Sequence, residues 1–226
     1  EVALLAVDLK ASRAVAAVKK VAFSGNPLTG GKLEYLGDGK YAQSDGKDIS
    51  GVSVLFPSMT QVTELDESDC GLGPTSMPEL AKLVRDAGAA LNSLSCENNP
   101  GMVGKLDQWG DLETPDAHAE VFKQLTDNLK TSQVTEVNFS SCGIGPVALG
   151  HLSDWVREAT AVLNSVIVDS TGNMRRQQTY TLTTGEEKID LSKKNLGSDD
   201  VALVAAWLQR PEVMAALNLL TIDSTG

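Results

Sequence analysis

The sequence predicts an α/β fold: a curved solenoid with a parallel sheet on its concave side and helices on its convex side. One frame, L-x-x-L-x-L-x-x-(N/C)-x-L, recurs six or seven times from about residue 18 onward. Its copies keep fixed offsets, since Val62 and Val134, and likewise Leu91 and Leu163, are 72 residues apart. Helical patterns follow several copies. A single strand–turn–helix unit cannot bury its own apolar face, so such units form a core by stacking side by side.

The composition is that of one globular domain over residues 1–226. The chain is 42% hydrophobic and 22% charged, which is enough apolar material for a sizeable core. Its net charge of -11 argues against binding to a nucleic-acid backbone or to an anionic membrane. No stretch approaches the roughly 18 to 20 apolar residues that a membrane span requires. Any partner selected by charge should therefore be basic.

The elements are predicted in order along the chain. A helix is expected over about residues 2–18, where apolar residues recur at helical spacing. Residues 30–51 are interpreted as a long ordered loop before a short helix at about 52–59. Residues 178–183 alternate like a strand and take the place of a helix. Further helices are expected at about 75–87, 147–160 and 198–209, and strands at the copies of the frame that begin at Val18, Val62, Leu91, Val134, Leu163 and Leu217 and around Ile189.

A larger unit contains two repeats, one of about 29 residues and one of about 43. The longer repeat carries an insertion, and its connecting segments agree: residues 26–34 read NPLTGGKLE and residues 99–107 read NPGMVGKLD. Leu83, Trp155 and Trp207 occupy the same helix position in their repeats. We therefore expect the two tryptophans to be core residues and not a stacking site for a ligand.

The stretch from Val134 to Leu152, VTEVNFSSCGIGPVALGHL, resembles the leucine-rich repeat family in its ribonuclease-inhibitor-like, helix-bearing subtype. Residues 62–83 support the same resemblance. It implies a curved solenoid, commonly intracellular, that binds other proteins through its concave sheet. The chain departs from the family pattern in the long inserts of alternate repeats, in the strand-like segment near Tyr180, and in Lys194 at the Asn position.

The cysteines indicate structural positions in a reduced protein. Cys70, Cys96 and Cys142 show neither the paired spacing of a disulfide framework nor that of a zinc site, which favours a cytoplasmic location. Cys70 and Cys142 occupy the Asn/Cys position of the frame. That position should turn inward and satisfy backbone groups left over at the strand end.

Strand alternation predicts which side chains line the concave face. Five of seven strands place a carboxylate there, and the positions considered hold no Lys or Arg. We therefore expect a non-enzymatic scaffold, without metal or cofactor, that binds a basic protein or peptide through this face. The alternative is that these positions are merely solvated. The predicted partner-binding residues are Asp66, Ser68, Ser95, Glu97, Asn138, Ser140, Asp169, Asp190 and Asp223.

Glu67 and Cys96 break the pattern. They occupy a slot that holds Phe139 in the reference copy and should be buried, and they fall on neighbouring strands. A buried, unpartnered carboxylate should have a raised pKa, or the packing around it should open. Three interpretations remain: a tolerated core carboxylate, a natural cavity site, or an engineered ligand-binding or reactive site. His118 and His151 are expected on helices, away from Cys96, so the pattern does not support a Cys-His hydrolase.

The frame ends on a strand without a following helix, which predicts an exposed sheet edge near Leu220. Such an edge could pair with the same edge of a second copy. The chain also begins without Met, so a segment of a longer protein is a further interpretation of the same pattern.

Overall fold

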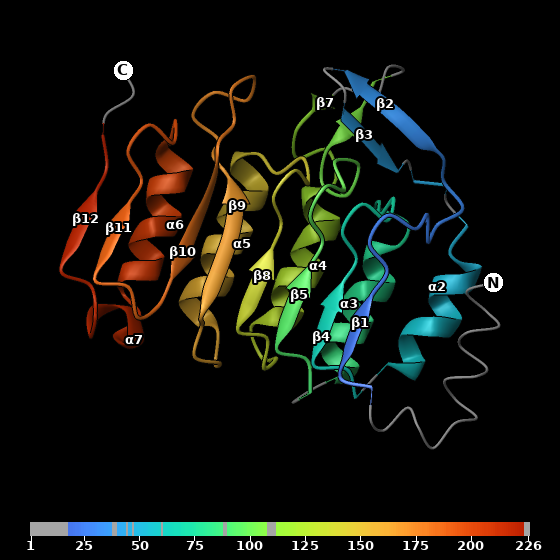
Figure 1. Ribbon diagram of the computed structural model, residues 1–226, viewed down its shortest axis with the longest axis horizontal. Coiled ribbons are helices and arrows are strands. Elements are labelled where there is room, and N and C mark those ends of the chain that lie inside the picture. Colours follow the sequence, from blue (N-terminus) through green and yellow to red (C-terminus); the bar gives the residue numbers. More distant parts are fainter. Residues whose placement is uncertain are drawn as a thin grey trace.

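A computed structural model describes residues 18–37, 40–43, 45–46, 48–59, 61–87, 90–107 and 112–223. The protein is a mixed α/β structure in which a mostly parallel sheet carries a layer of helices on one face (Figure 1). The helix expected over residues 2–18 falls, apart from its last residue, outside the described residues. Within the described part of the chain, no helix has both the length and the apolar character needed to cross a bilayer.

The main sheet has six strands in the order β1-β4-β5-β8-β9-β10. Its first five strands are parallel, and the central apolar residue of each copy of the frame pairs with its counterpart, as Leu65 does with Leu94 and Leu94 with Val137. The frame therefore predicts both the strands and their register correctly. The strands are β1 (Lys20–Ala22), β4 (Glu64–Asp66), β5 (Ser93–Ser95), β8 (Glu136–Asn138), β9 (Ser165–Asp169) and β10 (Thr179–Thr183).

The helices return behind the strands and pack on one another in sequence order, α3 on α4, α4 on α5 and α5 on α6. Trp155 and Trp207 are completely buried in this layer, and Leu83 is 4% exposed, so the expectation of core tryptophans is confirmed. The helices expected at about 52–59, 75–87, 147–160 and 198–209 are found as α2 (Ser50–Leu55) with the 3-10 turn η2 (Phe56–Ser58), α3 (Met77–Ala87), α5 (Pro146–Glu158) and α6 (Ser198–Leu208). Two further helices, α4 (Ala119–Leu129) and α7 (Pro211–Met214), were not assigned ranges from the sequence.

The inserts of the longer repeats are β-hairpins. The prediction of a long loop over residues 30–51 is wrong, because β2 (Leu33–Gly37) and β3 (Lys40–Gln43) pair antiparallel within this segment. The second insert likewise forms a hairpin of β6 (Lys105–Leu106) and β7 (Leu112–Thr114). The Gly-Asp-Gly sequence at 37–39, flanked by runs containing Leu and Tyr, is a hairpin signal that the loop interpretation overlooked.

The parallel series does not run from end to end, which corrects the prediction of one continuous sheet. The segment at 178–183 is a strand, as expected, but β10 pairs antiparallel with β9. It occupies the edge of β9 that the next parallel strand would have used, because the short connection after β9 allows a hairpin and not a crossover. β11 (Lys188–Asp190) and β12 (Leu219–Thr221) instead form a separate two-stranded parallel sheet.

The Asn/Cys position closes the strand ends, as predicted. Asn99 is fully buried; its Oδ1 accepts hydrogen bonds from the backbone N–H groups of Cys70 (3.1 Å) and Leu72 (2.8 Å). Its Nδ2 donates to the carbonyl oxygens of Glu67 (2.9 Å) and Cys96 (2.8 Å). One amide side chain therefore ties the ends of β4 and β5 together. The Cys142 thiol has a similar role, since its Sγ donates to the carbonyl oxygen of Cys96 at 3.0 Å.

Candidate functional site

The face of the six-stranded sheet that points away from the helices is the candidate site, and we call it the open face (Figure 1). Alternation along β4 shows how it forms: Leu65 is buried, whereas Glu64 is exposed and Asp66 is half-buried. The residues that share this face by strand alternation are Lys20, Glu64, Asp66, Ser68, Ser93, Ser95, Glu97, Glu136, Asn138, Ser165, Ile167, Asp169, Thr179, Thr181 and Thr183.

A shallow hollow of about 240 Å³ lies over β1, β4 and β5 of the open face. The hydroxyls of Ser68 and Ser95 lie 2.9 Å apart at its floor, and Lys20 Nζ forms a 3.0 Å ion pair with Glu64 across neighbouring strands. Both of these charged side chains are more than half exposed, so the pair contributes little to stability. We call this site the acidic hollow. Its lining is Lys20, Val21, Glu64, Leu65, Asp66, Ser68, Ser93, Ser95 and Glu97.

The acidic hollow brings together four of the predicted residues, Asp66, Ser68, Ser95 and Glu97. Sequence reasoning missed Lys20, Glu64 and Glu136, which extend the face by one alternation toward the N-terminal ends of the strands. The signal was present, because residues two positions apart on a strand share a face. The open face is therefore acidic with one cation at its edge, whereas the prediction had no cation there.

Farther along the sheet, the predicted polar residues form hydrogen bonds within the protein. Asn138 Nδ2 donates to a carboxylate oxygen of Glu97 at 3.0 Å. Asp169 accepts hydrogen bonds from the backbone N–H of Ser141 at 2.7 Å and from the hydroxyl of Thr179 at 2.6 Å. Both oxygens of Asp169 are therefore engaged within the protein, which leaves Asp66 and Glu97 as the more available carboxylates of the predicted set.

The predicted exposure of Ser140 is wrong. This residue is 4% exposed, and its hydroxyl donates to Oδ1 of Asn138 at 2.7 Å. The backbone N–H of Ser140 donates to the same oxygen at 3.0 Å. These two hydrogen bonds hold Ser140 against Asn138, so its burial depends on local contacts that strand alternation does not predict.

Asp190 and Asp223 are exposed but belong to the small sheet of β11 and β12, at the opposite end of the molecule from the acidic hollow (Figure 1). The backbone N–H groups of Ser192 and Lys193 donate to Asp190 and Asp223, at 2.9 and 2.8 Å. The hydrogen bond from the Ser192 side chain is the main cause of the lowered pKa of Asp190. These two carboxylates therefore do not join the acidic residues of β4 and β5.

Glu67 points from β4 into the core and is completely buried, with no hydrogen-bond partner for either carboxylate oxygen. Burial, with a smaller contribution from the charge of Asp66, raises the pKa of Glu67 to about 8, so the predicted rise is confirmed. In the reference copy the same slot holds Phe139, which is fully buried and packs edge-to-face on Phe122 with ring centroids 5.3 Å apart.

Cys96 directly follows β5, as Glu67 directly follows β4, and it is also completely buried. Burial, followed by the charge of Glu67, raises its thiol pKa well above the ordinary value. Burial is also the main reason why the pKa of the Cys70 thiol is raised to about 12. The thiolate is the nucleophilic form of cysteine, so this environment disfavours a reactive site at Cys96. Among the residues that the structure describes, no three His, Cys, Asp or Glu side chains gather as a metal site would require.

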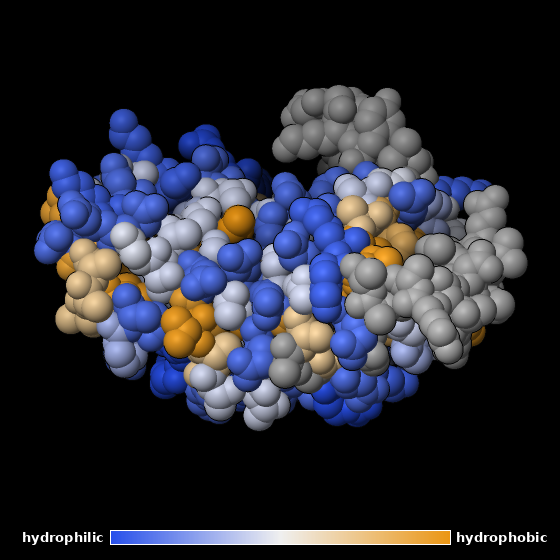
Figure 2. Space-filling model, turned by 60° about the horizontal axis from the view of Figure 1, so that its bottom comes forward, coloured by the Kyte–Doolittle hydropathy of each residue, from blue (hydrophilic) through white to orange (hydrophobic). Residues whose placement is uncertain are grey.

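The end of the molecule formed by α7 and β12 carries exposed apolar side chains, seen at the left of Figure 2. Met214 is 65% exposed, Leu219 50% and Ile222 39%. The frame predicted a buried position for Ile222, which is wrong because no described helix covers this strand. The edge-to-edge contact between two copies of this strand stays a prediction.

No protein-family model matches the chain, and no match is found among curated protein sequences. The argument about function therefore rests on the geometry of the open face.

Proposed function

We propose that the chain is a leucine-rich repeat solenoid of the helix-bearing subtype that acts as a non-enzymatic scaffold and binds a basic protein or peptide through its open face. The acidic hollow carries this proposal. Among the described residues, three carboxylates, those of Glu64, Asp66 and Glu97, line it with a single cation, Lys20. Support for the repeat architecture comes from the in-register pairing of successive copies of the frame and from the helices that return between them.

The chemistry of the hollow favours long cationic side chains. The backbone N–H and C=O groups of β4 and β5 are engaged in the parallel ladder on both sides, so a partner would contact the side chains of these strands. The serines at 68 and 95 are short and leave space between the carboxylates. An arginine of the partner could bind a carboxylate with two parallel hydrogen bonds, and a lysine could replace Lys20 beside Glu64. Such contacts determine specificity and association rate and are weakened by salt.

A reducing compartment such as the cytoplasm is part of the proposal. Its support is that all three cysteines are free and buried, with the thiols of Cys70 and Cys142 hydrogen-bonded to backbone carbonyl oxygens. No structural disulfide is needed to hold the described part of the fold.

The test compares two triple variants with the same change in net charge. Glu64, Asp66 and Glu97 are replaced by Lys in the first variant, which spares Asp169 because its oxygens are occupied. In the control, Lys replaces Glu120, Glu158 and Glu186, which are exposed and lie away from the open face. Binding of Lys- and Arg-rich peptides is measured by titration calorimetry at low and high salt.

We expect the first variant to lose at least about tenfold in affinity, because each lost close charge pair is worth on the order of 1 kcal/mol. The control should bind nearly as the unmodified protein does. Equal losses in both variants would show that net charge alone attracts the peptides, and unchanged binding by the first variant would exclude the hollow as the binding site.

A further inference from the structure

Glu67 lies directly beneath the acidic hollow. Its neighbours in sequence, Asp66 and Ser68, line the hollow, while its own side chain points to the other side of the sheet. The carboxyl group is completely buried, and neither oxygen has a hydrogen-bond partner. A core position that holds an aromatic or aliphatic residue in most copies of the frame therefore holds an unsatisfied acid under the candidate site.

The backbone of Glu67 is part of the structure that shapes the hollow. Its N–H donates to the carbonyl oxygen of Ser95 at 2.8 Å, and its carbonyl oxygen accepts from Asn99 Nδ2 at 2.9 Å. The next residue, Ser68, donates its backbone N–H to Oδ1 of Asp66 at 3.0 Å. A shift of Glu67 would therefore move the ends of β4 and β5 together, and with them the carboxylates and hydroxyls of the hollow.

The groups around Glu67 offer no compensating cation. The charge of Asp66, the preceding residue, raises the pKa of Glu67 further. The thiols of Cys96, directly after β5, and Cys70, in the turn after β4, are close enough for Glu67 to raise their pKa values. Among the described residues, α2 and α3 bury only apolar side chains behind these strands. An ionised Glu67 would be an uncompensated buried charge, which is strongly unfavourable unless water reaches it.

We propose that Glu67 is a pH-sensitive latch of the open face. In its protonated form it packs in the core and keeps the ends of β4 and β5 closed. When it releases its proton to solvent, the carboxylate must be hydrated, so these strand ends open and the acidic hollow loses its shape. The relevance to partner binding rests on the proposed function, but the latch itself operates without a partner.

The upper limit of the pH-dependent range lies at about pH 8, because burial raises the pKa of Glu67 to about 8 in the closed state. In the open, hydrated state the carboxyl would titrate at its ordinary value near 4.5. Between these two values the closed state holds a proton that the open state has released. Rising pH therefore favours opening across this window.

The experiment measures amide hydrogen exchange of the full chain at about pH 6 and about pH 9, in the unmodified protein and in Glu67→Gln. The reporting amides are those of Glu67 and Asp69, which donate to the carbonyl oxygens of Ser95 and Glu97. Dividing by the rates in the variant removes the ordinary pH dependence of exchange. The opening ratio should rise roughly 100-fold over this range, as linkage between the two pKa values requires. Asp66→Asn removes the neighbouring, half-buried carboxylate, whose charge is the smaller cause of the raised pKa of Glu67, and should keep most of the rise.

A second measurement does not depend on folding of the variant: the carboxyl carbon of Glu67 is titrated by NMR in the unmodified protein. A midpoint well above 4.5 and no higher than about 8 is expected, because opening is coupled to the titration, and a midpoint near 4.5 would overturn the latch. The same pH dependence of exchange in the unmodified protein and in Glu67→Gln would overturn it too. Failure of basic peptides to bind would reject the proposed function and leave both of these results unchanged, so the two ideas fail separately.

Discussion

The phenol of Tyr180 donates a 2.9 Å hydrogen bond to Oδ1 of Asp200, and this contact joins the antiparallel strand β10 to the first turn of α6. Oδ2 of the same carboxylate accepts from the backbone N–H groups of Thr171 and Gly197, at 2.8 and 2.7 Å. Burial, followed by the charge of Asp200, raises the pKa of Tyr180 well above its ordinary value. The strand that interrupts the parallel series is therefore fastened to the helix beyond the interruption.

Replacing Tyr180 by Phe should destabilise the protein by about 1–3 kcal/mol, because Oδ1 of the buried Asp200 would lose its phenol donor. Thr181→Val changes an exposed position on the same strand and should have little effect. Chemical denaturation at neutral pH measures both. Equal stability of Tyr180→Phe and the unmodified protein would mean that water replaces the phenol.

Asp116 follows the β6–β7 hairpin and caps the N-terminus of α5. Its carboxylate accepts hydrogen bonds from the backbone N–H groups of Gly145 at 2.9 Å, Val147 at 2.7 Å and Ala148 at 3.0 Å. Asp45, in the other insert, accepts a hydrogen bond from the side-chain hydroxyl of Thr75, two residues before α3, at 3.0 Å. The inserts are thus tied to the helix of the following unit.

Asp116→Ala should cost about 1–2 kcal/mol, because the free N–H groups at the start of α5 lose their acceptor. Asp154→Ala removes a carboxylate that lies within the same helix and forms an ion pair with Arg157, and it serves as the control. Thermal unfolding followed by circular dichroism compares them. A similar loss in both variants would contradict the capping role.

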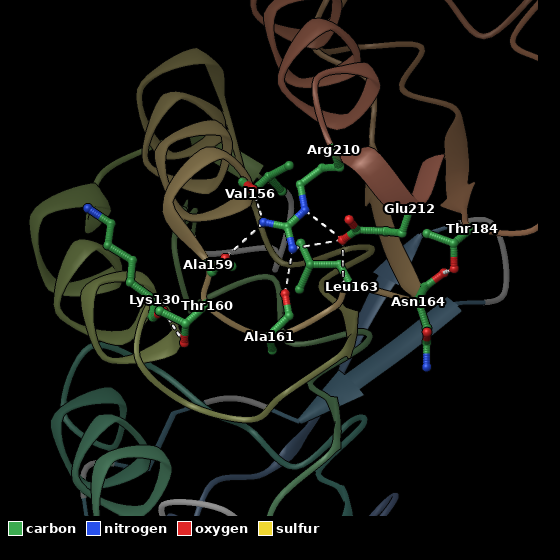
Figure 3. A network of polar contacts seen from close by, with 10 residues as sticks. All are labelled: Lys130, Val156, Ala159, Thr160, Ala161, Leu163, Asn164, Thr184, Arg210 and Glu212. Carbon is green, nitrogen blue, oxygen red and sulfur yellow. Dashed lines mark hydrogen bonds and ion pairs between the residues drawn. The ribbon is translucent and has the colours of Figure 1, made fainter. Parts of the chain in front are cut away.

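Arg210 closes the C-terminal end of α5 (Figure 3). Its guanidinium donates to the carbonyl oxygens of Val156 at 3.1 Å, Ala159 at 2.9 Å and Ala161, and pairs with Glu212 at 2.7 Å. The side chain is only 11% exposed. This network holds α6 and α7 against the C-terminal end of α5.

Arg210→Met should lower the free energy of unfolding by about 2–4 kcal/mol, because buried carbonyl groups and the carboxylate of Glu212 lose their charged donor. Arg210→Lys should recover only part of this loss, since an ammonium cannot match the planar fork of donors. Urea denaturation of the two variants provides the measurement. Full recovery by Lys would show that charge alone matters.

Glu67→Leu should stabilise the protein at alkaline pH and flatten its stability profile. The pKa of Glu67 is raised from 4.5 to about 8 in the folded state, so the stability due to its protonated form is fully present below about pH 4.5 and is lost as pH rises toward 8. Relative to Glu67→Leu, the unmodified protein should lose ~4 kcal/mol between about pH 5 and about pH 9. Urea denaturation across this range tests it; parallel profiles would refute the buried, protonated state.

The recurring frame predicted most of the main sheet because its physical basis is local. Residues such as Leu65, Leu94 and Val137 occupy equivalent positions and pair in register, so the spacing of apolar residues along the chain already contains the register. The two hairpins and the direction of β10 were harder to predict, because the residue pattern of one strand does not determine whether its neighbour runs parallel or antiparallel. The exposure of Ser140 was predicted wrongly because alternation gives the face of a side chain and not its burial, which here depends on its hydrogen bonds to Asn138.

The sequence by itself determined the mixed α/β architecture, the acidic character of the open face and the anomaly at Glu67. Each of these follows from the periodicity of the chain or from comparing one copy of the frame with another. Only the tertiary structure decided which carboxylates meet. Glu64, Asp66 and Glu97 come together with Lys20 around one hollow, whereas Asp169 is engaged by Thr179 and Asp190 lies on a separate sheet. The physical reason is that β10 takes the free edge of β9, and the pairing direction of a strand depends on partners that lie elsewhere in the chain.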